Sequence, residues 1–241
     1  TLQDGYNRQR QRRGLPVAVL ENQTLRATFA LGLGGRLWSL IHKPSGRELM
    51  CRNPVFQPAN LALRNAWFSG GVEWNAGPQV HTVTILSPVD ALVGTNDDGS
   101  AYLEVSNLEK TLRTRWTVRV TLHPGKAYLD EQIRITNPVD AVNPYYFWNC
   151  TAFPQLPGTR FIYPMSLGTD HFGVEFFNWP VNKGIDLEKF TKLDGITERL
   201  SGEPAVLYIE NWRGQRNPLY LCAAMQEVHK KYPNARLHLY N

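Results

Sequence analysis

From residue 115 to residue 122 the sequence alternates strictly between apolar and polar side chains. Successive side chains of a β-strand point to opposite faces, so this alternation predicts a strand with one buried face. Similar short runs recur along the chain between turn signals, without helical periodicity before about residue 180. The pattern restricts the chain to a mainly β fold, and we expect a large antiparallel sandwich. The buried face of this strand would carry Trp116, Val118, Val120 and Leu122.

Turn residues mark where the other predicted strands end. Asn96-Asp97-Asp98-Gly99 is a strong hairpin signal, and Pro44-Ser45-Gly46 ends another run. We expect Ile133 and Ile135 to point inward from their strand. A short β-branched run lies at 82–87. The remaining strands are predicted at 17–21, 24–30, 36–43, 92–93 with 102–105 across the hairpin, 128–137 and from 144 to 153.

The segment 191–241 follows a different pattern. An apolar run at 204–210 is followed by a polar, basic loop. Pro218 then stands where the first turn of a helix tolerates proline, and apolar residues follow at helical spacing before another strand at 236–240. This order predicts a short C-terminal βαβ segment. Because a parallel pair normally belongs to a larger sheet, we expect a further domain or subunit to pack on 191–241.

The net charge of the chain is unevenly distributed. It is +5, and four arginines among the first thirteen residues supply much of the excess. No nucleic-acid recognition motif accompanies them, so we expect a solvated basic arm at 1–16 and no nucleic-acid partner. The rest of the chain would divide into the sandwich at 17–190 and the βαβ segment at 191–241.

The number and spacing of the cysteines argue against a disulfide framework and a zinc site. Cys51, Cys150 and Cys222 are odd in number, far apart and without metal-ligand spacing. They indicate neither a disulfide framework nor a zinc site, and we expect no metal and no organic cofactor. No apolar run approaches the roughly 20 residues of a membrane span, and no signal peptide opens the chain. The expectation is a cytoplasmic protein without membrane contact.

The segment Gly70-Gly71-Val72-Glu73-Trp74-Asn75 concentrates side chains suited to binding a sugar. Two glycines free the backbone beside a carboxylate, an indole and an amide. His81 follows eight residues after Glu73 and adds a second group that titrates near neutral pH. We therefore predict Glu73 and His81 as catalytic acid and base, and Trp74 and Asn75 as ligands of the saccharide.

Further candidates lie elsewhere in the chain. His171, oriented by Asp170, is a third candidate for proton transfer. Tryptophan side chains can stack on a sugar, and guanidinium or amide groups can bind its hydroxyls or a carboxylate. The substrate-binding candidates of these kinds are Arg64, Asn65, Trp148, Asn149 and Trp179.

Each candidate also has a structural interpretation. Glu73 could form a salt bridge with Arg64 or Arg36, and His81 could pack rather than face a sugar. The pair at 170–171 could hold a loop through hydrogen bonds, and any of the tryptophans could belong to the core. The glycine pairs at 34–35 and 70–71 are most simply devices for tight turns.

Residues 17–180 resemble an uncharacterised domain family that often precedes tetratricopeptide repeats and is related to the galactose mutarotase superfamily. The segments that carry the resemblance are LENQTLRATFALGLGGRLWSL, GRELMCRNPVFQPANLALRNAWFSGGVEWN and NPYYFWNCTAFP. The resemblance implies a galactose mutarotase-like β-supersandwich that binds a carbohydrate in a groove on one sheet.

The mutarotase catalytic pair is not carried over. In mutarotases a histidine within an Asn-His-Ser-Tyr-Phe-like strand is the acid, and here the similar stretch is Asn149-Cys150-Thr151-Ala152-Phe153. Cys150 thus stands where that histidine would be. The glutamate base has no counterpart in this sequence. The resemblance therefore implies sugar binding without this acid–base pair.

A second resemblance covers about residues 182–241. The segments NKGIDLEKF and PAVLYIENWRGQRNPLYLCAAMQEVHKKYPNARLHLYN are similar to the nucleotide-sugar half of two-Rossmann-domain glycosyltransferases. In that family a basic loop after the first strand helps to bind the donor diphosphate. The resemblance would give this role to Arg213 and Arg216.

Three functions follow from these observations. The first is an enzyme that acts on a mono- or oligosaccharide by acid–base chemistry, of epimerase or glycosidase type. The second is a non-catalytic sugar-binding module that uses the same groove. The third is a fragment of a nucleotide-sugar-dependent glycosyltransferase. Sugar recognition in the β domain is the interpretation that we favour.

Overall fold

The computed structural model describes most of the chain in two compact units, Thr1–Gln155 and Leu156–Asn241. The division falls after residue 155, earlier than the boundary expected from the sequence at 190. Residues 9–16 of the predicted basic arm are exposed and have no regular secondary structure. The described residues are 9–53, 70–77, 81–82, 84–154, 156, 158–170, 173–189, 230 and 233, with the backbone of 205–209 and 236–240.

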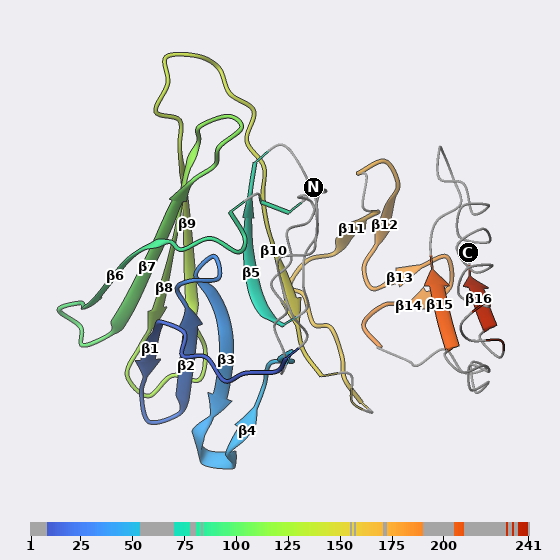
Figure 1. The fold of residues 1–241 in the computed structure, drawn as a ribbon, viewed down its shortest axis with the longest axis horizontal. Coiled ribbons are helices and arrows are strands. Elements are labelled where there is room, and N and C mark those ends of the chain that lie inside the picture. Colours follow the sequence, from blue (N-terminus) through green and yellow to red (C-terminus); the bar gives the residue numbers. More distant parts are fainter. Residues whose placement is uncertain are drawn as a thin grey trace. The chain divides into compact units, whose positions relative to one another are not determined.

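The first sheet of the N-terminal unit is antiparallel and has the order β1-β2-β3-β5-β10, with β4 added to β3 (Figure 1). The last strand enters from far along the sequence and pairs with β5 over its full length. The strands of this sheet are β1 (Val17–Glu21), β2 (Leu25–Ala30), β3 (Arg36–His42), β4 (Arg47–Glu48), β5 (Gly71–Ala76) and β10 (Phe147–Ala152).

The second sheet is a four-stranded antiparallel meander in the order β6-β7-β8-β9. The predicted hairpin turn joins its first two strands, where Asp98 Oδ1 accepts a 2.9 Å hydrogen bond from the Ser100 backbone N–H and Gly99 has a φ of 80°. Its strands are β6 (Asp90–Thr95), β7 (Ala101–Leu108), β8 (Arg115–Leu122) and β9 (Asp130–Thr136).

The hydrophobic core lies between these two sheets. Alternate residues of β8 are buried, so the prediction made from its sequence pattern is confirmed. Each fully buried valine or leucine side chain contributes about 1.5–3 kcal/mol to folding. The mainly β, antiparallel sandwich expected from the sequence is therefore the observed architecture. The opposing sheet contributes Ala18, Leu20, Leu25, Ala27, Phe29, Leu37, Val72, Trp74 and Ala76 to the same core.

Two details of the sandwich differ from the sequence analysis. Ile133 pairs with Val118 in the ladder and so shares its face, but 41% of the residue remains exposed because β9 is the last strand of its sheet. The β-branched run at 82–87 contributes a turn at 84–86 rather than a strand. In both cases the position in the folded sheet, rather than the strand preference of the local sequence, decides the outcome.

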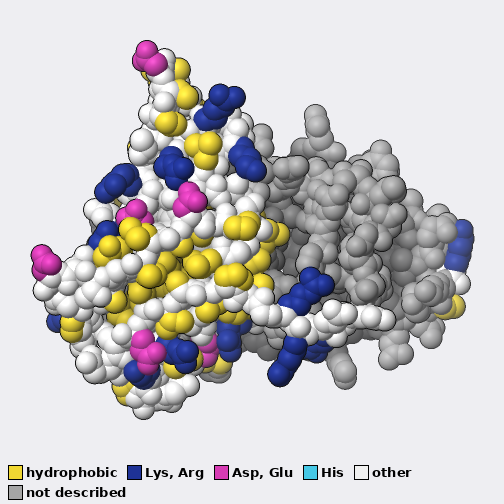
Figure 2. All heavy atoms as spheres, turned by 60° about the vertical axis from the view of Figure 1, so that its left-hand side comes forward, with side chains coloured by type: hydrophobic (Ala, Val, Ile, Leu, Met, Phe, Trp, Pro, Cys, Tyr) yellow, Lys and Arg dark blue, Asp and Glu magenta, His cyan; other side chains and the backbone are white. Residues whose placement is uncertain are grey.

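Apolar surface also remains at the rim of the sandwich. Figure 2 shows hydrophobic side chains gathered in one area of the N-terminal unit, with charged side chains around it. The edge strands β1 and β6 carry exposed apolar residues, namely Val17, Val19, Leu92 and Val93.

The described residues of the C-terminal unit form three two-stranded sheets. Two are short antiparallel hairpins, and the third is parallel. The parallel pair supplies the two strands of the predicted βαβ segment. Of the helix predicted between them only Lys230 is described, and it is helical. The strands are β11 (Leu167–Thr169), β12 (Phe176–Asn178), β13 (Val181–Asn182), β14 (Ile185–Asp186), β15 (Ala205–Ile209) and β16 (Arg236–Tyr240).

Within the part of the chain that the structure describes, no helix has both the length and the hydropathy that a membrane crossing requires.

Candidate functional site

Glycines place β5 very close to β3. Gly70 and Gly71 have φ values of 140° and 64°, which side chains rarely adopt. A Cβ atom on Gly71 would stand 1.8 Å from the Leu37 carbonyl oxygen, a severe clash with backbone. The glycine pair is therefore the backbone device expected from the sequence, and it sets β5 firmly within the sheet.

The two faces of β5 lie in different environments. All six of its residues are buried, but neighbouring side chains point to opposite sides. Trp74 faces the core with 4% of its surface exposed, and its indole N–H donates a 3.0 Å hydrogen bond to the Gly35 carbonyl. The prediction that Trp74 stacks on a sugar beside Glu73 is wrong, because residues adjacent in a strand cannot face the same groove.

Glu73 lies on the other face, in a buried ion pair with Arg36 of β3. A guanidinium N–H donates to Glu73 Oε2 at 2.6 Å, and a second N–H donates to the Gly70 carbonyl at 2.6 Å. Both side chains are at most 2% exposed. Burial lowers the pKa of Arg36, and the Glu73 carboxylate opposes that shift. The salt bridge to Arg36 considered in the sequence analysis is therefore present.

Asn75 shares the face of Glu73 but is fully buried. Its amide N–H donates to Glu73 Oε1 at 2.9 Å, and its Oδ1 accepts from the Thr82 backbone N–H at 3.0 Å. The predicted role of Asn75 as a sugar ligand is thus wrong: both ends of its amide bind protein groups. It connects the carboxylate to the chain segment that follows β5.

His81 completes the hydrogen bonds to Glu73. Its Nδ1 lies 2.7 Å from Oε1, and because a carboxylate only accepts, Nδ1–H is the donor. The His81 side chain is 15% exposed, and its backbone has a φ of 55°, in the left-handed region. Thr82 helps to hold this position, since its hydroxyl donates to the Ala76 carbonyl at 2.8 Å. The structure thus brings Glu73 and His81 together, while their catalytic roles stay predictions.

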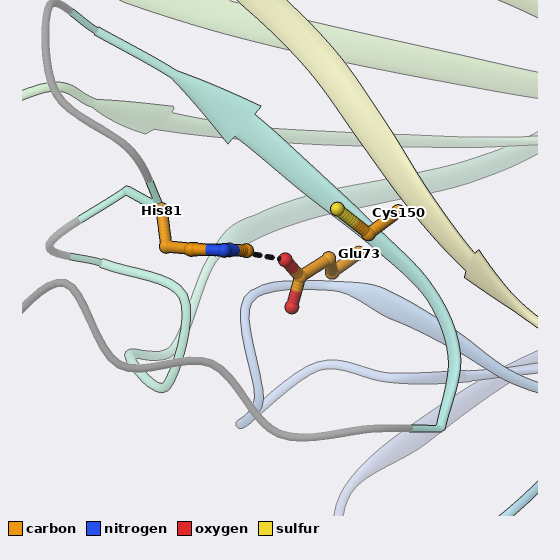
Figure 3. A group of neighbouring side chains, drawn as sticks. All are labelled: Glu73, His81 and Cys150. Carbon is orange, nitrogen blue, oxygen red and sulfur yellow. Dashed lines mark hydrogen bonds and ion pairs between the residues drawn. The ribbon is translucent and has the colours of Figure 1, made fainter. Parts of the chain in front are cut away.

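Strand β10 adds Cys150 and Trp148 to the same face. The ladder places Cys150 opposite Glu73 and Trp148 opposite Asn75. Figure 3 shows the Glu73 carboxylate and the Cys150 sulfur on the side from which His81 approaches. Burial is the main cause that raises the pKa of the Cys150 thiol, and the charge of Glu73 adds to it.

Aromatic rings border this group. The Trp148 ring meets His81 edge to face, with centroids 6.1 Å apart, and Tyr146 lies 4.8 Å from Trp148. Trp148 is half-buried, whereas Tyr146 is 52% exposed. Sequence reasoning missed Tyr146, although its spacing of two residues from Trp148 places both side chains on one face of an extended chain.

Asn149 points to the opposite face of β10. It stands opposite Trp74 in the ladder, and its side chain hydrogen-bonds to Glu131 of β9. It is therefore not on the face that carries Glu73 and His81, and the predicted grouping of Asn149 with them is wrong. The cause is again the alternation of side chains along a strand.

The other candidates lie in the C-terminal unit or outside the described residues. Asp170 holds the turn between β11 and β12, where its Oδ1 accepts from the backbone N–H groups of Val174 and Glu175 at 2.8 and 3.0 Å. Trp179 packs edge to face on Tyr163, with centroids 5.2 Å apart. The candidates outside the described residues are Arg64, Asn65, His171, Arg213 and Arg216.

The family of the chain follows from comparison with known proteins. The family DUF5107, described as a domain of unknown function, matches residues 2–211. This chain belongs to that family. The prediction of an uncharacterised family is thereby confirmed, while the resemblances to mutarotases and to glycosyltransferases stay predictions.

A solved structure shares the fold. It is the crystal structure of a TPR-domain containing protein from Parabacteroides distasonis, with a TM-score of 0.60 and 23% sequence identity. The match covers 72% of this chain and 30% of that protein, so this chain spans less than a third of its length. At this identity the similarity shows a common fold.

Proposed function

We propose that the N-terminal unit recognises a mono- or oligosaccharide on the face of its first sheet that carries His81, Trp148 and Tyr146. The observation that carries the proposal is the contact between an oriented imidazole and an aromatic pair that is partly open to solvent. A sugar offers both an apolar C–H face and hydroxyl groups. A site for it needs an aromatic surface next to a hydrogen-bonding group.

The geometry supplies both kinds of contact. Tyr146 and Trp148 present rings that combine an apolar face with a polar edge. The Glu73 carboxylate accepts from the imidazole Nδ1–H, so Nε2 is the acceptor nitrogen of this ring. A buried, charged partner keeps the imidazole in one orientation, which lowers the entropy cost of binding.

The surroundings of Glu73 favour binding over turnover. Donors from Arg36, Asn75 and His81 all converge on its carboxylate. A catalytic acid must hold and release a proton during the reaction. The Glu73 oxygens that would carry this proton already accept hydrogen bonds from three protein groups, which argues against that role. We therefore favour a non-catalytic sugar-binding module. Acid–base chemistry of epimerase or glycosidase type is the alternative.

Two aromatic residues of equal exposure provide the test. Tyr146 is 52% exposed beside the site, and Tyr128 is 50% exposed beside His123. A glycan array identifies a binding saccharide, and titration calorimetry then compares the variants. We expect Tyr146→Ala to weaken binding by about threefold to tenfold, because one aromatic contact typically contributes that much to affinity. Tyr128→Ala should leave the affinity unchanged.

Two results would contradict the proposal: no saccharide on the array binds, or both tyrosine variants bind as tightly as the parent chain. Turnover of the bound saccharide by the parent chain would instead favour the catalytic alternative.

A further inference from the structure

We propose that Glu73, His81 and Cys150 form a binding site for a divalent transition-metal ion, of which zinc is the best fit. The ligand atoms of these three residues all lie within 4.8 Å of one another (Figure 3). Cys150 lies far along the sequence from Glu73 and His81, so cysteine spacing gave no sign of the site. The inference stands on this geometry and does not depend on saccharide binding.

The fold brings the three groups together before any ion binds. Cys150 and Glu73 are direct partners in the ladder between β10 and β5, so their side chains leave the same face side by side. His81 is delivered by the segment after β5, which Thr82 ties back to Ala76. Around a tetrahedral zinc ion with ordinary bond lengths, ligand atoms stand roughly 3.3–3.8 Å apart. In this structure the ligand atoms are 2.7 Å apart for His81 and Glu73 and at most 4.8 Å apart for any pair, a range that spans this spacing.

The donor set selects the kind of metal. A thiolate, an imidazole and a carboxylate are the three ligand types that zinc accepts in proteins. Calcium and magnesium prefer oxygen ligands, and this group supplies oxygen from one residue only. Cobalt(II) occupies such sites as a spectroscopic substitute with similar ligand preferences. The chemistry therefore indicates zinc, with cobalt as the probe.

Metal binding requires protons at these groups to leave or move. The imidazole Nδ1–H donates to Glu73, and burial, followed by the nearby Glu73 carboxylate, raises the pKa of the Cys150 thiol. On metal binding the thiol proton leaves to solvent, the imidazole proton moves to Nε2, and sulfur, Nδ1 and Oε1 become ligands. Each ion bound thus releases one proton from the neutral imidazole and thiol forms.

Neighbouring groups suit a bound ion. Arg36 holds the second carboxylate oxygen of Glu73, and so fixes the orientation of a ligand through its other oxygen. Burial raises the pKa of the Cys150 thiol, and the neighbouring Trp148 side chain opposes that shift. Three protein ligands leave a fourth position for water or a substrate hydroxyl, as in zinc sites with catalytic roles.

Cobalt titration of the full chain tests the site directly. We expect one equivalent of cobalt to give the near-ultraviolet charge-transfer band of a cobalt–thiolate bond, and zinc to abolish it by competition. Cys150→Ser should remove the band, whereas Cys51→Ser, at an exposed cysteine, should retain it. His81→Ala should weaken cobalt binding by roughly tenfold or more. Absence of the band, or its survival in Cys150→Ser, would overturn the proposal.

A second measurement needs no variant in the site. Iodoacetamide alkylates the thiolate form of cysteine, and a metal ligand is protected from it. We expect zinc to slow alkylation of Cys150 by roughly tenfold or more while Cys51 reacts at its original rate, as measured by peptide mass spectrometry. Equal rates for Cys150 with and without zinc would refute the site, whatever the saccharide experiments show.

Discussion

Arg36 and Glu73 place opposite charges 2.6 Å apart on neighbouring strands, almost without contact with solvent. Such a pair contributes modestly while it is intact, because the cost of removing both ions from water offsets their attraction. Loss of one partner is far more harmful, since it leaves the other charge buried without compensation. The pair also orients His81 through Glu73, so its loss affects the site and the fold together.

This argument predicts a large effect of Arg36→Leu. We expect the substitution to lower the free energy of unfolding by about 3–5 kcal/mol, as for other buried pairs that lose one ion. Urea denaturation followed by tryptophan fluorescence measures it. The matched control is Arg115→Leu, which removes an exposed pair with Asp90 at 3.3 Å and should change stability by about 0–1 kcal/mol. Similar losses for both variants would show that burial does not decide the effect.

At the scale of the element, β5 depends on a backbone that lacks side chains at its start. Gly71 and Gly125 have nearly the same φ, 64° and 67°, but different surroundings. A Cβ atom at Gly71 meets the Leu37 carbonyl, whereas one at Gly125 has no atom within 4 Å. The two positions therefore separate the cost of left-handed backbone from the cost of steric overlap.

Alanine substitution at these two glycines should give unequal results. Gly125→Ala carries only the left-handed backbone cost, about 1–2 kcal/mol. Gly71→Ala adds the overlap with β3, and we expect it to lose about 3 kcal/mol or more and to displace β5. Chemical denaturation measures both values. If Gly71→Ala is no less stable than Gly125→Ala, the close approach of β5 and β3 is not a constraint on the fold.

Sequence predicts these elements well where its signals are local. The alternation at β8 and the turn before Ser100 identified strands, a hairpin and a buried face correctly. The same rule of alternation should have separated Trp74 from Glu73. Proximity in sequence suggested a common groove there, while the strand sends these side chains to opposite faces.

The pairing of β5 with β10 lay beyond sequence reasoning. It joins Glu73 to Cys150 across 77 residues, and its register is set by the packing of the whole sandwich rather than by a local pattern. The partner of Glu73 was likewise left open between Arg36 and Arg64, because strand neighbours along the sheet are not neighbours in the chain. The site is therefore a product of topology, whereas the strands that build it are products of local pattern.

At the scale of the whole molecule, the core and the candidate site both belong to the N-terminal unit. Every described residue of the hydrophobic core lies between Ala18 and Phe147, and β10 ends at Ala152. A domain with its own core can fold without its neighbours. The unit Thr1–Gln155 should therefore be an independent folding unit that retains both proposed ligand sites.

A pair of truncated chains tests this independence. We expect residues 1–155 to unfold in one cooperative thermal transition, and to bind cobalt or saccharide as the full chain does. A chain of residues 1–143 lacks β10. Glu73 then has no Cys150 opposite it, and Phe147 no longer packs against the core. That shorter chain should lose the cooperative transition in near-ultraviolet circular dichroism. If 1–155 also lacks a transition, the N-terminal unit requires residues beyond Gln155, and the division into two folding units is wrong.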